Sequence, residues 1–285
     1  MKETYMMNGQ SMIDLIKQRT SIRTYANTPI EPEKRAAMKA FLKENTDNPF
    51  GAQVRFALID KADAPHRLGT YGLLRGMKTF IVGCAVPGAM DMEGFGYAFE
   101  KAVLFAGSLG LGTCWAGGTF TRGAFANAVG LKDEILPAIS PLGYASKRPS
   151  VIERMTAAGA GARTRKAFGE MFFDGDFDTP LQLPDGALKT CLEMVRIGPS
   201  ASNKQPWRVV KQGGKLHFYL QKTKNYAGNG AFGFCMQCID MGIAACHFEL
   251  SARALGLIGK IMIDDPGLLT QSQGDSGLSY KYSWG

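Results

Sequence analysis

The stretch from Gly198 to Trp207 carries short hydroxyl and amide side chains that could bind a planar, polar ligand. Its sequence is Gly-Pro-Ser-Ala-Ser-Asn-Lys-Gln-Pro-Trp, and it lies between a helical apolar pattern and a strand-like Val-Val pair. Gly198, Pro199 and Pro206 prevent it from continuing as helix. Serine, asparagine and glutamine both donate and accept hydrogen bonds, which suits a ligand rimmed with heteroatoms. Taken alone, the same composition is also ordinary loop chemistry.

The composition is that of a globular chain with a basic balance. The 285 residues are 45% hydrophobic and 20% charged, and the formal net charge is +8. This length permits one large domain or two intertwined ones. The basic residues are scattered, apart from a loose cluster between Lys147 and Lys166, and no helix-turn-helix, zinc-finger or RNP-type string accompanies them. We therefore expect no nucleic-acid partner, and an anionic small ligand explains the excess charge as well as DNA does.

No segment predicts export or a membrane span. The N-terminal residues lack the apolar core and the small-residue cleavage site of a signal peptide. Residues 102–120 carry no charge, but five glycines interrupt them, so we expect a buried helix followed by a loop. The sequence thus predicts a soluble, cytoplasmic protein without a membrane partner.

The six cysteines are interpreted as reduced thiols, since no secretory signal accompanies them. Cys235 and Cys238 have a spacing that suggests a metal site, with Cys246 and Cys191 as possible further ligands. Cys235, Cys238 and Cys246 also fall within a helical apolar pattern, so we expect core thiols and no metal. The three histidines form no recognisable metal-binding or nucleophile pattern.

The elements that must position these residues occur in a similar order twice, with an offset of roughly 145 residues. The first half predicts a helix capped at Ser11, a helix from Pro32, strands over 54–59 and 80–86, a long helix over 94–109 and a strand over 139–144. The second half predicts a helix over 185–197, a hairpin of 207–210 and 216–220 turning at Gly213-Gly214, and a long helix over 234–254. Glycines follow both long helices.

We therefore expect an α+β fold of two similar halves, residues 1–155 and 156–285, intertwined enough to count as one domain. A chance likeness between two α+β halves is the alternative. The halves look complementary. Residues 48–53 stand where the second half has its Ser-Asn loop, and lack its serines and tryptophan. Residues 258–262 stand where the first half has Thr-Cys-Trp-Ala-Gly-Gly.

Three segments resemble motifs of the nitroreductase family of FMN-dependent oxidoreductases. Residues 199–207 match the signature Pro-Ser-x-x-Asn-x-Gln-Pro-Trp, residues 19–23 match Arg-x-Ser-x-Arg/Lys, and residues 110–118 read Gly-Leu-Gly-Thr-Cys-Trp-Ala-Gly-Gly. The resemblance covers nearly the whole chain and is to the single-chain, duplicated branch. It implies a pseudo-dimer with mixed sheets and long central helices. Family members are ordinarily homodimers that bind FMN with residues of both subunits, so the fused chain would retain one FMN site and a degenerate second one.

The resemblance implies cofactor-binding residues in both halves. In the first half these are Arg19, Ser21, Arg23, Trp115, Ala116, Gly117, Gly118, Lys147 and Arg148; in the second they are Pro199, Ser200, Ala201, Ser202, Asn203 and Gln205.

These residues divide by role. Cationic groups and a hydroxyl would bind the phosphate dianion, namely Arg19, Ser21, Lys147 and Arg148. Arg23 would face the N1/C2 carbonyl edge of the flavin, where a cation stabilises the reduced form. Ser200, Ser202 and Asn203 would bond the pyrimidine rim or the ribityl hydroxyls, and the Gly117-Gly118 backbone would approach N5 and O4. Gln205 would fix the loop, and Trp207 is expected in the core.

The residues also permit plainer roles. Arg19 and Arg23 alone also fit a solvated helix end, where cations meet the macrodipole favourably. The aromatic side chains Tyr71, Phe95, Tyr97 and Phe120 could line a substrate pocket or simply pack in the core.

The activity that the resemblance implies is NAD(P)H-dependent reduction of a small electrophile, nitroaromatic or quinone-like, by ping-pong hydride transfer. Such chemistry needs neither a metal nor a protein nucleophile. The sequence lacks a Rossmann fingerprint, since residues 107–112 lie at a helix end, so nicotinamide would visit without a dedicated domain. Alternatives are a flavin-binding module without turnover, or the same fold with dehalogenating or flavin-fragmenting chemistry. We expect a monomer or a weak homo-oligomer.

Overall fold

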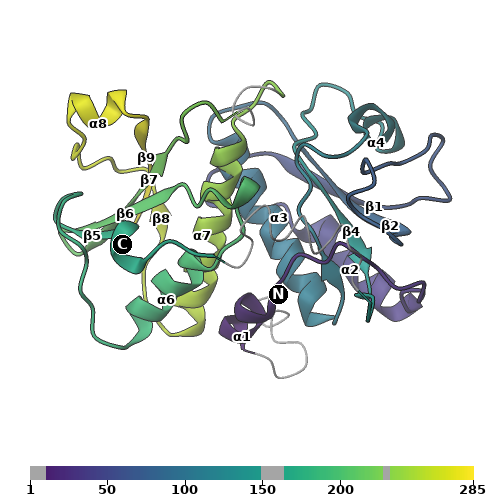
Figure 1. The fold of residues 1–285 in the computed structure, drawn as a ribbon, viewed down its shortest axis with the longest axis horizontal. Helices are drawn as coiled ribbons and strands as arrows, with labels where there is room; N and C mark the ends of the chain where they lie inside the picture. Colours follow the sequence, from purple (N-terminus) through teal and green to yellow (C-terminus); the bar gives the residue numbers. More distant parts are fainter. Residues whose placement is uncertain (1–10, 149–163, 227–231) are drawn as a thin grey trace. The chain divides into compact units, whose positions relative to one another are not determined.

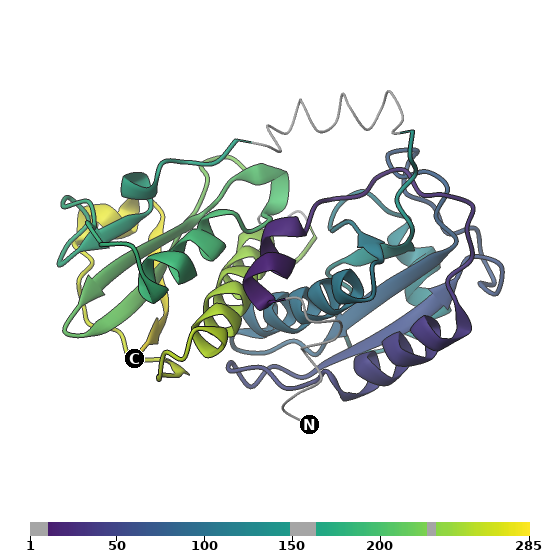
Figure 2. The ribbon, with the colours of Figure 1, turned by 90° about the horizontal axis from the view of Figure 1, so that it is seen from below.

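The structure is a computed structural model that describes residues 11–148, 164–226 and 232–285 (Figure 1 and Figure 2). The chain divides into two compact units, Met1–Arg163 and Thr164–Gly285, called unit 1 and unit 2 below. Each unit combines helices with a β-sheet, so the predicted α+β class is confirmed.

Unit 1 contains a four-stranded sheet in the order β1-β2-β4-β3. Its strands are β1 (Val54–Asp60), β2 (Thr79–Ala85), β3 (Gly112–Thr113) and β4 (Ile139–Gly143), and its helices are α1 (Met12–Gln18), α2 (Pro32–Glu44), α3 (Asp91–Ser108) and α4 (Arg122–Ala128). The paired strands run antiparallel. A parallel bridge joins Ser21 to Thr113, so the segment that follows α1 runs along β3.

The first two helices begin at sequence signals that need no tertiary contact. Ser11 Oγ accepts a hydrogen bond from the Asp14 backbone N–H at 3.1 Å and donates one to Asp14 Oδ2 at 2.7 Å. This side-chain cap starts α1, as predicted. Pro32 occupies the first position of α2, where a helix needs no backbone N–H.

Helix α3 is buried almost all round and packs on β2 through a glycine. A Cβ added at Gly83 would lie 2.6 Å from Phe95 Cε2 and 2.9 Å from Phe99 Cδ2. Both rings are fully buried and stack on each other, with centroids 5.4 Å apart. Because neither ring can move aside without losing this packing, only glycine lets the helix and the strand approach so closely.

Unit 2 contains a five-stranded sheet in the order β5-β6-β7-β9-β8. Its strands are β5 (Phe172–Asp174), β6 (Trp207–Gln212), β7 (Lys215–Gln221), β8 (Ile261–Met262) and β9 (Leu278–Trp284), and its helices are η2 (Phe168–Glu170), α6 (Ala187–Arg196), η3 (Ala201–Asn203), α7 (Met236–Ala254) and α8 (Gln271–Asp275). The β5–β6 pair is parallel and the others are antiparallel.

The two units share a strand order. Four strands of unit 2, in the order β6-β7-β9-β8, correspond to β1-β2-β4-β3 of unit 1, with α7 and α3 in equivalent places along the chain. The long helices also end alike. Gly110 and Gly256 follow them with φ values of +73° and +74°. The next residues, Leu111 and Leu257, each donate a backbone N–H to a carbonyl of the last turn at 2.9 Å. These are glycine C-caps of the Schellman type. Gene duplication as their origin stays a prediction.

The predicted elements are present with boundaries shifted by a few residues. Gly213 and Gly214 both have positive φ, of +58° and +77°, and form the hairpin turn that the sequence predicts. Among the strands and α-helices, β3, β5, β9, α4 and α8 were not predicted from the sequence. Of these, β9 had a usable signal, because Tyr280, Tyr282 and Trp284 alternate with polar residues as in a strand.

The prediction that all six cysteines are thiols is wrong for one pair. Cys235 and Cys238 form a disulfide, whereas the other four cysteines are buried thiols. The reason is where α7 begins. Cys235 is its N-cap, one residue before the first helical residue, and not a member of the helix itself. The Cα atoms of the pair lie 5.3 Å apart, within the range that a disulfide spans.

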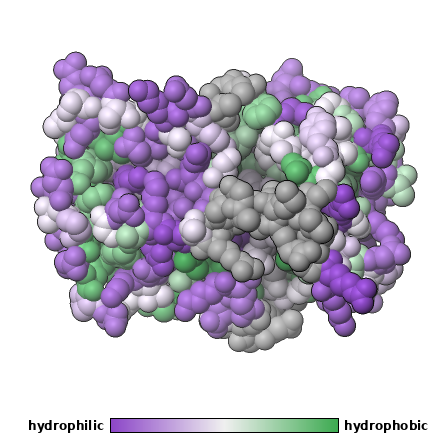
Figure 3. Space-filling model, viewed as in Figure 1, coloured by the Kyte–Doolittle hydropathy of each residue, from purple (hydrophilic) through white to green (hydrophobic). Residues whose placement is uncertain are grey.

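Within the ranges that the structure describes, no helix is both long and apolar enough to cross a membrane. The uncharged residues 102–120 belong partly to the buried end of α3 and partly to a loop, as predicted, but the short strand β3 within them was not predicted. On the face shown in Figure 3, hydrophilic residues dominate and hydrophobic areas are small and dispersed.

The contact between β2 and α3 gives a first prediction. Gly83→Ala should destabilise the protein by about 1–3 kcal/mol, because its methyl group must displace Phe95 and Phe99. Gly107→Ala is the matched control. Gly107 is an exposed residue of α3, and a Cβ there meets nothing within 4 Å, so this change should leave stability equal or higher. Thermal melts followed by circular dichroism measure both. Equal melting temperatures for the two variants would show that the close approach of β2 to α3 does not require glycine at position 83.

Candidate functional site

The Ser-Asn loop of unit 2 has an unusual backbone. Ser202, Asn203 and Gln205 have φ values of +49°, +52° and +49°. Left-handed conformations are uncommon for residues other than glycine, and they persist only where surrounding contacts impose them. Three of them within four positions therefore mark a loop whose shape is imposed by the rest of unit 2.

Hydrogen bonds within unit 2 impose that shape. Ser200 Oγ accepts from the Gln205 backbone N–H at 2.9 Å. The buried Gln205 side chain accepts from the Lys166 backbone N–H at 2.9 Å and donates to the Asn203 carbonyl at 3.1 Å. Gln205 is thus bonded on both sides of its amide, in the fixing role expected of it. Trp207 is fully buried, as predicted.

Asn203 is engaged with the segment that opens unit 2. Its Oδ1 accepts a hydrogen bond from Arg165 at 3.2 Å, and its Nδ2 donates to the Thr164 carbonyl at 3.1 Å. Arg165 also donates to the carbonyl of Ile197 at 3.1 Å. Arg165 belongs to the loose basic cluster between Lys147 and Lys166, and it lies beside the Ser-Asn loop. Ser202 is exposed, and its hydroxyl lies 3.3 Å from the Tyr226 hydroxyl.

A buried carboxyl group that the sequence analysis missed lies next to the loop. Asp240, on α7, accepts a hydrogen bond from the Ala201 backbone N–H at 2.9 Å through Oδ1. Its Oδ2 has no hydrogen-bond partner among the described residues. Burial raises the pKa of Asp240 well above its ordinary value, because the charged form is poorly solvated inside the protein. The usable signal was a single acidic residue in the apolar run Cys-Ile-Asp-Met-Gly-Ile.

Positive charge gathers around the same loop. Burial, together with the like charges of Arg208 and Lys204, lowers the pKa of Lys166 to about 8, although Glu170 opposes the shift. Burial also lowers the pKa of Arg208, whose guanidinium donates to the Gln205 and Trp207 carbonyls at 3.2 and 2.7 Å. A half-buried lysine that is readily deprotonated is typical of a place where cations outnumber anions.

In unit 1 the structure brings the Arg-x-Ser-x-Arg segment and the glycine loop together. The Ile22 backbone N–H bonds to the Thr113 carbonyl at 2.8 Å, continuing the bridge between Ser21 and Thr113. Arg23 lies half-buried, with a guanidinium nitrogen 3.5 Å from the Ser21 carbonyl. A Cβ at Gly112 would lie 2.7 Å from Ile22 Cγ1, so this approach needs glycine.

A second buried carboxyl group links Arg19 with Trp115. Glu100, on α3, is fully buried and accepts a hydrogen bond from Trp115 Nε1 at 2.6 Å. Its other oxygen lies 3.8 Å from Arg19 Nε. Trp115 also packs against Phe99, with ring centroids 4.5 Å apart. Arg19 and Trp115, both predicted to bind the cofactor, therefore contact one carboxylate of the central helix.

The remaining predicted residues of unit 1 lie in loops next to these segments. The Ser146 backbone N–H bonds to the Thr24 carbonyl at 2.9 Å, so the exposed Lys147 and Arg148 follow directly after a pairing with the Arg23–Tyr25 segment. Ala116 pairs with Ile139. Gly118 is exposed, and the Gly117 carbonyl accepts a hydrogen bond from Arg122 at 2.6 Å.

Several open alternatives resolve to structural roles. Phe95, Tyr97 and Phe120 are buried core residues, whereas Tyr71 is exposed. Of the described histidines, His217 contacts the Ser283 hydroxyl and His247 the Met194 carbonyl. No group of three or more histidine, cysteine or acidic residues in the described ranges could hold a metal ion.

The fold is that of a nitroreductase-type oxidoreductase. The sequence model of the family described as "Putative TM nitroreductase" matches residues 11–252. This match spans most of the chain, and the chain therefore belongs to that nitroreductase family. No curated protein sequence matches the chain.

Solved structures agree with this assignment at the level of the fold. A "putative nitroreductase" from Thermotoga maritima MSB8 is 18% identical, with a TM-score of 0.61, and the match covers 96% of this chain and 93% of that one. The likeness shows that the chain has the nitroreductase fold over nearly its whole length.

Two shorter proteins match about half of the chain. One is an FMN-dependent nitroreductase from Clostridium difficile R20291, 20% identical, covering 48% of this chain and 90% of its own, with a TM-score of 0.38. The other is a nitroreductase with bound FMN from Bacteroides fragilis NCTC 9343, 15% identical, covering 50% of this chain and 92% of its own, also with a TM-score of 0.38. At TM-scores this low, the two similarities support no conclusion about this chain.

The buried carboxyl group of Asp240 gives a pH-dependent prediction. The folded state holds this proton at pH values where the unfolded chain, with an aspartate pKa of about 3.9, has released it. The folded state therefore binds more protons, and Asp240 makes stability fall as pH rises above about 4. Asp240→Asn keeps an acceptor for Ala201 and cannot ionise. Its melting temperature relative to the wild type should rise with pH, by up to roughly 2–4 °C per pH unit.

The exposed Asp275 is the matched control, and Asp275→Asn should show no such trend. Melts of the ligand-free protein between pH 4 and pH 8 measure both variants. A constant difference between Asp240→Asn and the wild type would contradict the protonated state assigned to this residue.

For Lys166, the predicted change of stability with pH has the opposite sign to that for Asp240. Between its folded pKa of about 8 and its ordinary value of 10.5, the unfolded chain binds more protons than the folded one. The wild type should therefore gain stability with rising pH across this window. Lys166→Met removes the crowded charge, so the variant should be at least as stable at pH 7, with an advantage that shrinks above pH 8. Lys222→Met, at an exposed lysine of unit 2, is the control. An advantage that stays constant up to pH 10 would contradict the assignment.

Proposed function

We propose that the chain is an FMN-dependent oxidoreductase that reduces a small electrophile with NAD(P)H, and that one chain binds one FMN. The observation that carries the proposal is the Ser-Asn loop, whose left-handed residues are fixed by buried contacts and surrounded by cations. Family membership supports an oxidoreductase. The identities of the cofactor, the reductant and the acceptor are part of the proposal. FMN is also the cofactor named for the Clostridium difficile and Bacteroides fragilis proteins.

The residues present suit FMN. Its phosphate needs cations and hydroxyl groups, and unit 1 offers the exposed Lys147 and Arg148 together with Ser21. Arg19 is assigned to the phosphate as well. It lies beside Glu100, so its charge is partly balanced already and the phosphate would compete with that carboxylate. The orphaned Asp240 oxygen and the polar loop beside it suit a ligand with both donors and acceptors on its rim.

The flavin edge is assigned to a cation and to short polar groups. Arg23 would stabilise negative charge at the N1/C2 edge, and the Gly117-Gly118 backbone would bond near N5. Ser200 bonds to Gln205 within the loop and Asn203 bonds to Arg165 outside it, so of the three polar side chains the exposed Ser202 is the one most available to a ligand. Trp115, Ala116, Pro199, Ala201 and Gln205 would shape the surroundings through packing and backbone groups.

When bound, FMN would supply two-electron chemistry, taking hydride from NAD(P)H and passing it to a nitroaromatic or quinone-like acceptor in alternation. The chain's own residues bind and orient it, and fix the backbone that faces it. One chain would suffice as a monomer, which a mass measurement in solution can test.

A matched set of variants tests the assignment. Arg23→Met in unit 1 and Ser202→Glu in unit 2 should each weaken FMN binding about tenfold or more, by loss of a cation and by gain of an opposing charge. Arg67→Met and Ser272→Glu make the same changes at exposed positions of the same units, and should leave the affinity within about twofold. Titration of flavin fluorescence measures all four. An unchanged affinity in Ser202→Glu would remove unit 2 from the site.

NAD(P)H oxidation with a quinone or nitroaromatic acceptor tests the activity. The proposal expects an acceptor-dependent rate well above that of free FMN. Tight FMN binding without such a rate would favour a flavin-binding module and contradict the oxidoreductase reaction. Product analysis separates acceptor reduction from dehalogenation or fragmentation of the flavin.

A further inference from the structure

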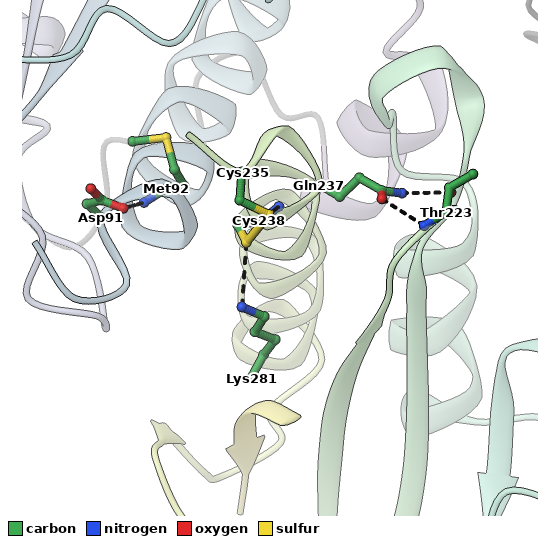
Figure 4. The surroundings of a disulfide bond; sticks show 7 residues. All are labelled: Asp91, Met92, Thr223, Cys235, Gln237, Cys238 and Lys281. Carbon is green, nitrogen blue, oxygen red and sulfur yellow. Dashed lines mark hydrogen bonds between the residues drawn. A yellow bond between two sulfur atoms is a disulfide. The ribbon is translucent and has the colours of Figure 1, made fainter. Parts of the chain in front are cut away.

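The disulfide between Cys235 and Cys238 lies at the start of a long, buried helix, a position that stabilises thiolates. Figure 4 shows the pair in the first turn of α7, with Lys281 pointing at it from β9. Cys235 is half-buried and Cys238 is buried. Cys235 is therefore the sulfur more open to an external reagent.

Two contacts would stabilise the thiolates that form when this bond opens. Cys235 Sγ accepts a hydrogen bond from the Cys238 backbone N–H at 3.2 Å, so it takes the N-cap position of a 19-residue helix. Backbone N–H groups and the helix dipole favour negative charge there. The Lys281 ammonium lies 3.5 Å from Cys238 Sγ and supplies a positive charge to the second sulfur.

The remaining four cysteines provide an internal contrast. Cys84, Cys114, Cys191 and Cys246 are buried and are not part of a disulfide. Burial raises the pKa of Cys84 to about 11 and that of Cys191 to about 12, so these thiols resist conversion to thiolates.

The start of α7 is also held by contacts that do not involve sulfur. Gln237 accepts a hydrogen bond from the Thr223 backbone N–H at 2.9 Å and donates one to Thr223 Oγ1 at 3.0 Å (Figure 4). This pair ties the first turn of the helix to the chain just after β7. When the disulfide opens, this contact would therefore keep the two sulfurs close enough to re-form the bond.

We propose that Cys235 and Cys238 are a redox-active pair that exchanges two electrons with an external dithiol, an activity separate from the flavin chemistry above. A thiolate of the dithiol attacks Cys235 Sγ, the Cys235–Cys238 bond breaks, and Cys238 leaves as a thiolate beside Lys281. The second thiol of the partner, once deprotonated, attacks the mixed disulfide and releases Cys235 at the helix N-terminus. The partner is oxidised to a disulfide, the pair is reduced, and the partner's two protons pass to the new thiols or to solvent.

Alkylation of the native protein tests reducibility. After treatment with dithiothreitol, iodoacetamide followed by peptide mass analysis should label Cys235 first, at least about tenfold faster than any of the four cysteines outside the pair. The circular dichroism spectrum should stay unchanged on reduction, because Gln237 holds the helix start. A disulfide that resists dithiothreitol until the protein unfolds would overturn the proposal, and so would labelling of Cys235 at the rate of the buried thiols.

Catalysis of exchange is the second readout. The chain should accelerate the reduction of insulin disulfides by dithiothreitol. Cys235→Ser should abolish that acceleration, whereas Cys246→Ala, at a buried cysteine of the same helix, should preserve it. Lys281→Met should slow exchange about tenfold and Lys281→Arg should restore it, with Lys222→Met as the surface control. Melting temperatures confirm that each variant is folded. If the wild type does not accelerate insulin reduction, the proposal is overturned. A loss of stability in Cys235→Ser would then show that the disulfide is purely structural.

Discussion

Each unit contains one long helix that is buried almost all round, and a carboxyl group on that helix must find its partners inside the protein. Glu100 on α3 accepts from Trp115 and lies near Arg19; Asp240 on α7 accepts from Ala201. A buried carboxyl group without such partners costs several kcal/mol. The loops that carry the candidate site are therefore fixed to the central helices by polar contacts as well as by packing. In unit 2 the bond from Ala201 to Asp240 adds to the Ser200 and Gln205 hydrogen bonds that hold three left-handed residues within four positions.

How much the sequence predicted depended on whether the signal was local. The long helices and the β6–β7 hairpin were predicted because their apolar periods and the Gly213-Gly214 turn lie within the segments themselves. Strand β9 pairs with β7, some sixty residues earlier, and no local turn announces that pairing. The residue types of the candidate site were predictable from motifs, but their partners were not. Glu100 and Asp240 reach these segments through tertiary contacts, and only their isolation within apolar helices hinted at burial.

The cysteines show how a small boundary shift changes the chemistry assigned to a residue. A helix over 234–254 places Cys235 inside an apolar face, where a thiol is inert. The observed helix begins at Met236, so Cys235 becomes its N-cap, with a backbone N–H on its sulfur and Lys281 near its partner. Helix boundaries are the least certain part of any assignment from periodicity. A shift of the helix start by two residues therefore changes the expectation for Cys235 from a core thiol to a disulfide at the helix N-terminus.

We propose that one chain binds a single FMN. The most direct test is a titration of the flavin-free chain with FMN, followed by fluorescence quenching at protein concentrations well above the dissociation constant. The account predicts saturation at one FMN per chain, with a single affinity. Saturation at two equivalent FMN molecules per chain would show that the chain holds two complete sites, and no binding at all would leave the nitroreductase fold without its proposed cofactor. Either result would contradict the account.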